Sequence, residues 1–170
     1  TECFPALNRA GHYHYRSVWL TLERLTKEGF RRPAVILNRS VQARIHSMQL
    51  AAFITNHPSP ELSQKLVQYS PPEDFSGLKP WSKQLQPDAL IVAWQVDQKA
   101  ARTLRQIAPS AKRMVTLDWQ PRGALPGIDP CNETIAANAV DLVIAQLHRN
   151  EFGLPARPTT LLLDGTWREI

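Results

Sequence analysis

Hydrophobic residues follow two different spacings along this chain. Val18, Leu22 and Leu25 recur at the i, i+4, i+7 spacing of an amphipathic helix, predicted over residues 15–27 and capped by Gly29. The same spacing predicts further helices over residues 41–56, 74–86 (broken near Pro80), 97–108 and 133–148. Apolar runs between polar or turn residues predict buried strands over residues 33–37, 65–69, 88–93, 113–117 and 159–163.

In the helix predicted over residues 97–108, Ala100, Leu104 and Ile107 are expected to face inward and Arg102 and Arg105 outward. In two other predicted helices the helical spacing is carried by a row of residues on one side. In the helix over residues 41–56 this row consists of Val41, Ile45, Met48 and Ala52. In the helix over residues 133–148 it consists of Ile135, Ala139, Leu142 and Gln146, with Val143 and Leu147 beside it.

The alternation of strands and helices predicts the fold class. Strands separated by helices are typical of βαβ units, so we expect an α/β fold with a mostly parallel sheet flanked by helices. Strands of such a sheet are buried on both faces, which explains why they read as solid apolar runs. The length of 170 residues corresponds to about one domain, and 43% hydrophobic residues can form a real core.

The charge balance is basic, but its distribution argues against nucleic-acid binding by this chain. The formal net charge is +5. The tightest basic groups are short and contain no interleaved aromatic residues: Arg31 with Arg32, and the spaced set Lys99, Arg102, Arg105, Lys112 and Arg113. No apolar run approaches the roughly 20 residues of a membrane helix. The chain begins at Thr1 without a basic-then-apolar leader, so we expect no signal peptide and no membrane contact.

Motifs for phosphate binding and nucleophilic catalysis are absent. Gly123 and Gly127 are four residues apart, so neither G-x-G-x-x-G nor the P-loop is present. There is no G-x-S-x-G motif. Cys131 lies beside a predicted helix start, where a thiol can be activated, but no base is identified beside it. We therefore expect neither a cofactor nor enzymatic activity.

Metal-binding patterns are also incomplete. Cys3 and Cys131 form no C-x-x-C pair. His12 and His14 could face the same way, yet no third ligand follows at a recognisable spacing. We expect no metal, and we expect the two histidines to line a surface or the edge of a pocket.

Polar and aromatic side chains follow three of the predicted strands. Ligands of parallel α/β sheets bind beyond the carboxyl ends of the strands. The residues there are Asn38, Arg39, Ser40 and Arg44 after the first strand, Trp94, Gln95 and Asp97 after the third, and Asp118, Trp119 and Gln120 after the fourth. Indole rings stack on sugars or bases, and charged groups bond hydroxyls, so the pattern suits a small polar ligand. The other interpretation, in which polar residues end strands and the tryptophans fill the core, stays open.

Four segments resemble the effector-binding domain of lactose-repressor-type (LacI/GalR) transcription regulators, which share the type I periplasmic-binding-protein fold. They lie in the order and spacing of that family and cover nearly the whole chain. They are HYHYRSVWLTLERLTKEGFRRPAVIL (12–37), SVQARIHSMQLAAF (40–53), QPDALIVAWQVDQKAARTLRQ (86–106) and the stretch 126–169 that begins PGIDPCNETIAANAV.

The resemblance implies a set of ligand-binding residues. Arg44 matches the family arginine that clamps the effector, and a guanidinium fork suits that role. Asp118 matches the aspartate after the strand, whereas Trp94 stands where many members have asparagine and offers a stacking face instead. Trp167 and Glu169 are expected to pack rather than bind. The candidate ligand-binding residues are Arg44, Asp118, Trp94, His14, Asp129 and Trp119.

The resemblance also implies an organisation and a function. The chain would be the C-terminal portion of a cytoplasmic two-lobe sensor and would begin after the DNA-reading helix-turn-helix and most of the first lobe. Its parts would be residues 1–10 in the first lobe, 11–125 as the main lobe, 126–150 crossing into the first lobe and 151–170 returning. A small, sugar-like effector would control operator binding by a homodimer, with DNA contacted only through the helix-turn-helix absent from this chain.

Two alternatives remain at the level of sequence. One is a periplasmic sugar-binding protein of a transporter, which has the same fold. The other is an α/β enzyme such as a sugar-modifying hydrolase, for which no positioned nucleophile or acid–base pair is identified.

Overall fold

The computed structural model describes residues 6–72 and 74–170 of the chain. Cys3 and the first half of the expected lobe segment 1–10 lie outside the described residues. No helix in the described part of the chain is long and apolar enough to cross a membrane.

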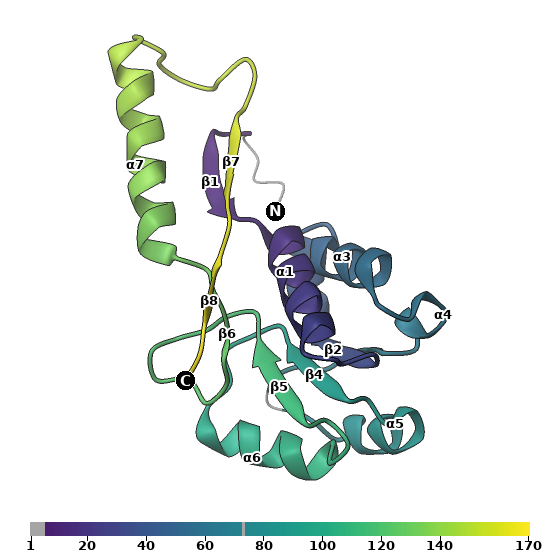
Figure 1. The fold of residues 1–170 in the computed structure, drawn as a ribbon. Coiled ribbons are helices and arrows are strands. Elements are labelled where there is room, and N and C mark those ends of the chain that lie inside the picture. Colours follow the sequence, from purple (N-terminus) through teal and green to yellow (C-terminus); the bar gives the residue numbers. More distant parts are fainter. Residues whose placement is uncertain (1–5, 73) are drawn as a thin grey trace.

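A six-stranded sheet forms the centre of the fold (Figure 1). Its strand order is β3-β2-β4-β5-β6-β8, with every pair parallel except the antiparallel pair of β6 and β8. In that order the strands are Val67–Tyr69, Pro33–Leu37, Ala89–Val92, Arg113–Thr116, Gly127–Asp129 and Thr166–Arg168. The predicted α/β fold with a mostly parallel sheet is confirmed.

Helices cover both faces of this sheet, with α1 and α3 on one side and α5 and α6 on the other (Figure 1). The helices are α1 His14–Lys27, α2 Arg39–Arg44, α3 Met48–Asn56, α4 Pro60–Ser63, α5 Leu78–Leu85, α6 Gln98–Ile107 and α7 Asn132–His148. The predicted break near Pro80 is wrong: proline fits the first turn of α5, where its missing N–H has no helical partner to lose.

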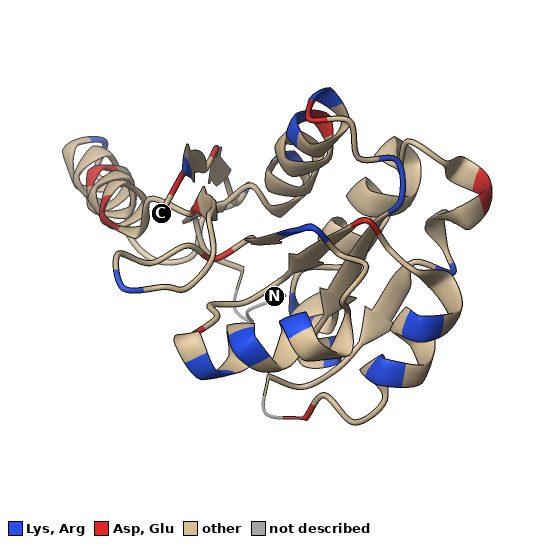
Figure 2. Ribbon diagram, turned by 60° about the horizontal axis from the view of Figure 1, so that its bottom comes forward, with Lys and Arg blue, Asp and Glu red and all other residues tan. Residues whose placement is uncertain are grey.

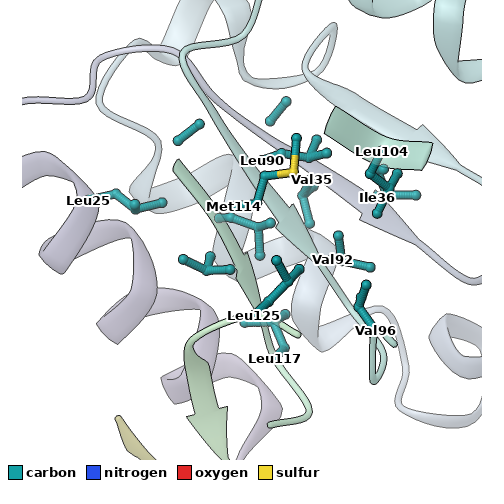
Figure 3. Packing of buried hydrophobic residues seen from close by; sticks show 14 of the residues in the cluster. Leu25, Val35, Ile36, Leu90, Val92, Val96, Leu104, Met114, Leu117 and Leu125 are labelled. Carbon is teal, nitrogen blue, oxygen red and sulfur yellow. The ribbon is translucent and has the colours of Figure 1, made fainter. Parts of the chain in front are cut away.

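The core lies between the sheet and its helices (Figure 3). Every residue of β2 and β4 is buried, as solid apolar runs predict. Val18, Leu22 and Leu25 of α1 are at most 1% exposed, which confirms the predicted inward row. After this helix Gly29 adopts a left-handed φ of 94° and its N–H bonds the Thr26 carbonyl, so the chain turns directly into β2.

The helix predicted over residues 41–56 is in fact two helices. His46 and Ser47 both have left-handed φ angles, which end α2 and begin α3. Gln42 and Gln49 are buried across this break, and Gln42 Nε2 donates to Gln49 Oε1 at 2.6 Å. Because of the break, the row at helical spacing is not buried as one face: Ala52 is fully buried, whereas Val41, Ile45 and Met48 are only partly buried.

Short strands at the edge of the sheet were not predicted. β6 lies within a segment expected to be a loop, and β8 follows the last predicted strand. At Gly127 a β-carbon would overlap the carbonyl oxygen of Thr116, so only glycine lets β6 lie against β5. Trp167 of β8 packs against the core, in agreement with the expectation for the end of the chain.

A smaller unit extends from the carboxyl edge of the sheet (Figure 1). In it β1, Arg9–His12, pairs in parallel with β7, Thr160–Leu163, and α7 packs against β1. None of the residues of α7 is buried, although the row of Ile135, Ala139, Leu142 and Gln146 is partly covered. Three chain segments connect this unit to the main sheet: β1 to α1, β6 to α7, and β7 to β8.

Candidate ligand-binding site

Two histidines mark the point where the smaller unit meets the main sheet. His12 ends β1 and His14 begins α1, and their rings meet edge to face with centroids 5.0 Å apart. The His12 Nε2 atom lies 2.7 Å from the Oγ of Ser17, which is fully buried in the next turn of α1. The structure thus fixes the imidazole of His12 and places His14 beside it.

His14 is brought into electrostatic contact with two other predicted site residues. Burial lowers its pKa to about 4, and the positive charges of His12 and Arg44 act in the same direction. The carboxylate of Asp118 opposes this shift. At pH 7 the His14 imidazole is therefore neutral and can both donate and accept a hydrogen bond. Of the six predicted residues, Arg44 and Asp118 are therefore near enough to His14 for their charges to act on it.

Arg44 is positioned by the short helix α2. The Asn38 side chain caps this helix by accepting hydrogen bonds from the Ser40 N–H at 2.9 Å and from the Ser40 hydroxyl at 2.7 Å. Arg44 lies in the last turn, and its side chain is exposed. An exposed guanidinium at the carboxyl edge of β2 can offer two parallel N–H donors to a ligand.

Asp118 and Trp94 are tied together by a residue that the sequence did not single out. The Thr116 hydroxyl donates to the Trp94 carbonyl at 2.7 Å and accepts from the Asp118 N–H at 3.0 Å. Gln120 Nε2 donates to Asp118 Oδ1 at 3.3 Å. Thr116 is a polar residue within the largely apolar run RMVTL, and this feature of the sequence could have pointed to it.

Asp129 and Trp119 belong to a second group. Both residues line a cavity of about 510 Å³ at the start of α7. Among the described residues that line it, no other comes from the predicted six. Arg168 lines the same cavity: its Nε lies 3.2 Å from Asp129 Oδ2, and its guanidinium lies 5.9 Å from the centre of the Trp119 ring. Asp129 also accepts from the Cys131 N–H at 2.8 Å. The carboxylate of Asp129 is thus held by partners within the protein. Nothing in the sequence indicated that Arg168 would lie beside it.

Metal binding finds no support in the part of the chain that the structure describes. There, no group of three or more histidine, cysteine or acidic side chains could hold a metal ion. His12 instead bonds Ser17, and burial lowers its pKa against the opposing charges of Asp164 and Asp129.

Comparison with known proteins gives a consistent answer at the level of structure. No family model and no curated protein matches the sequence. Solved structures do match the fold. A putative ribose operon repressor from Burkholderia thailandensis aligns at a TM-score of 0.64 with 14% identity, over 98% of this chain and 65% of that one. The chain has the fold of LacI-type effector-binding domains.

Two further structures with the LacI-type fold lead to the same conclusion. The transcription regulator CcpA of Lactococcus lactis aligns at a TM-score of 0.58 with 12% identity, over 94% of this chain and 62% of that one. A periplasmic binding protein/LacI transcriptional regulator from Alkaliphilus metalliredigens, complexed with D-xylulofuranose, aligns at 0.61 with 15% identity, over 95% and 64%. The resemblance in fold noted from the sequence is confirmed, and this chain spans 62–65% of the length of the three structures.

Proposed function

We propose that this chain is the effector-sensing part of a DNA-binding transcription regulator and that its effector is a small, sugar-like molecule. The observation that carries the proposal is that His14, Arg44 and Asp118 follow β1, β2 and β5 in the chain, where the charges of Arg44 and Asp118 act on His14. The LacI-type fold supports it, as does the sugar bound in one structure of that fold.

The chemistry of these three residues suits a polyhydroxylated ligand. Arg44 supplies donors in a fixed fork, and the carboxylate of Asp118 accepts hydrogen bonds from hydroxyl groups. The neutral His14 supplies one donor and one acceptor. The half-buried indole of Trp94, which follows β4, offers an apolar face for a sugar ring. We assign Trp119 and Asp129 to the edge of the site, beside Arg168.

Signalling in this proposal depends on two lobes. We propose that β1, α7 and β7 belong to the first lobe, so that the chain returns to the main lobe at Gly165 rather than at residue 151. A ligand that prefers one arrangement of the lobes shifts the population toward it. In a homodimer this shift would change the spacing of two DNA-reading modules that lie outside this chain.

Saturation-transfer NMR tests the proposal because it detects weak binding by an incomplete cleft. The chain is screened against ribose, D-xylulose, xylose and disaccharides at millimolar concentration. We expect a signal from at least one sugar, abolished in Arg44→Gln and in Asp118→Asn. The control Lys65→Gln removes an exposed charge at the opposite edge of the sheet and should keep the signal.

Two results would count against the proposal. A sugar signal that survives both site substitutions would place binding elsewhere, and silence across the panel would contradict a sugar-like effector. Sugar binding in a whole protein that carries no DNA-binding module would favour the transporter binding protein instead.

A further inference from the structure

A basic face covers the helices α5 and α6, on the side of the sheet away from α1 and α3. Figure 2 shows the lysines and arginines of these two helices together at the front of the molecule. We define the basic face by its six exposed side chains: Lys79, Lys83, Lys99, Arg102, Arg105 and Lys112.

The positive charge of this face is not neutralised within the described part of the chain. The ion pairs found there hold other cations: Arg16, Arg24, Lys27, Arg113, Arg149 and Arg168. None of the six side chains of the basic face takes part in one. Much of the chain's net charge of +5 is therefore concentrated here.

The acidic residues nearest in sequence, within the described part of the chain, are Asp74, Asp88 and Asp97, and each accepts hydrogen bonds from backbone N–H groups. Asp97 caps α6 and accepts from the Ala100 N–H at 2.7 Å. The carboxylate of Asp88 accepts from the backbone N–H groups of Arg31 and Arg32 at 2.7–3.0 Å. These carboxylates keep their negative charge, but the six cations of the basic face outnumber them, so the face presents a net positive potential to its surroundings.

We propose that the basic face binds an acidic segment of a partner protein, rich in aspartate and glutamate. Lys99, Arg102 and Arg105 follow one another at every third residue of α6, so a chain of carboxylates can meet them in succession. The same helices also carry the part-exposed apolar side chains of Leu85 and Ile107. A protein segment can contact charges and apolar groups together, whereas a phosphate backbone uses only the charges.

Two other partners fit less well. A second copy of this chain, docked face to face, would bring like charges together, which costs free energy. Single-stranded nucleic acid is bound through exposed aromatic rings. The aromatic side chain of α5, Trp81, is instead half-buried and donates its indole N–H to the Lys65 carbonyl at 2.9 Å.

Fluorescence anisotropy with a labelled oligoglutamate peptide tests the proposal on the full 170-residue chain. We expect saturable binding at low salt that weakens as salt is added. The triple variant Lys99→Gln, Arg102→Gln, Arg105→Gln should raise the Kd at least about tenfold. The matched control Lys27→Gln, Arg149→Gln, Arg157→Gln removes the same charge from exposed positions elsewhere and should stay within about twofold of wild type.

Each remaining outcome overturns the proposal. An equal rise in the Kd for the peptide in both triple variants would mean that net charge alone attracts the peptide. Tighter binding of a labelled DNA duplex than of the peptide at the same salt would assign the face to nucleic acid. A change of oligomeric state in the α6 variant alone, seen by sedimentation, would make the face an interface between copies of this chain.

Discussion

His14 combines two properties that a sensing site needs, namely a fixed position and a defined protonation state. It begins α1 directly after β1, so the backbone of the connection between the two units sets its place. Burial, followed by the charges of His12 and Arg44, lowers its pKa to about 4. A neutral imidazole near a guanidinium avoids repulsion between two cations.

This pKa predicts how stability depends on pH. Between pH 6.5 and about 4 the unfolded chain binds a proton at His14 that the folded chain does not. The contribution of the neutral His14 to the free energy of unfolding is therefore fully present above pH 6.5, and it is lost as the pH falls toward about 4. When the pH is lowered from 6.5 to about 4, we expect the free energy of unfolding to fall less in His14→Gln than in wild type. Urea denaturation at these two pH values measures the difference. Equal losses in the two proteins would show that His14 does not titrate in this way.

Single residues differ in how far the sequence predicts them. Arg44 and Asp118 remain predictions for the site, and the sequence can suggest them because polar residues after buried strands converge at one edge of a parallel sheet. Arg168 was missed because it lies on β8, whose place beside β6 depends on a pairing between strands that are distant in sequence. Local patterns carry no information about such a pairing.

The break between α2 and α3 shows how a buried polar pair decides the course of an element. A continuous helix would put Val41, Ile45, Met48 and Ala52 on one face, and the apolar spacing alone favours that. The structure instead buries Gln42, which bonds Gln49 and also accepts from the Leu50 N–H at 3.3 Å. The apolar spacing is present in the sequence, but the chain breaks at His46 and Ser47 and buries this local hydrogen-bonded pair.

Removing one partner of this pair should be costly. Gln42→Leu leaves the buried Gln49 oxygen and the part-buried Leu50 N–H without this partner, so we expect a loss of about 1–3 kcal/mol in the free energy of unfolding. Urea denaturation measures this. The exposed control Gln84→Leu on α5 should change stability by no more than about 0.5 kcal/mol. If Gln42→Leu were as stable as this control, the pair would not hold the break.

At the scale of the whole molecule the chain has two units of very different completeness. The main unit buries β2 and β4 on both faces, and its fold followed from the sequence because each apolar run pairs with a neighbour inside this chain. In the smaller unit α7 carries apolar residues on both sides, a pattern typical of a helix covered all round. One side meets β1, while Val140, Val143, Ile144 and Leu147 remain 43–57% exposed. The sequence predicted this helix correctly but had no means of showing that its second face stays uncovered.

This asymmetry predicts unequal stability within one molecule. A two-stranded sheet is marginal by itself, and the helix that covers it has no buried residue, so β1, β7 and α7 should open without unfolding of the main sheet. Native-state hydrogen exchange of this chain should give opening free energies for α7 amides at least about 2 kcal/mol below those of β2 and β4. The amides of α1, which contacts α3 and lies on the main sheet, serve as the internal reference for a well-packed helix and should exchange with the strands. If α7 were protected as strongly as α1, the uncovered apolar face would have to be buried in solution by another molecule, and that protection would then increase with protein concentration.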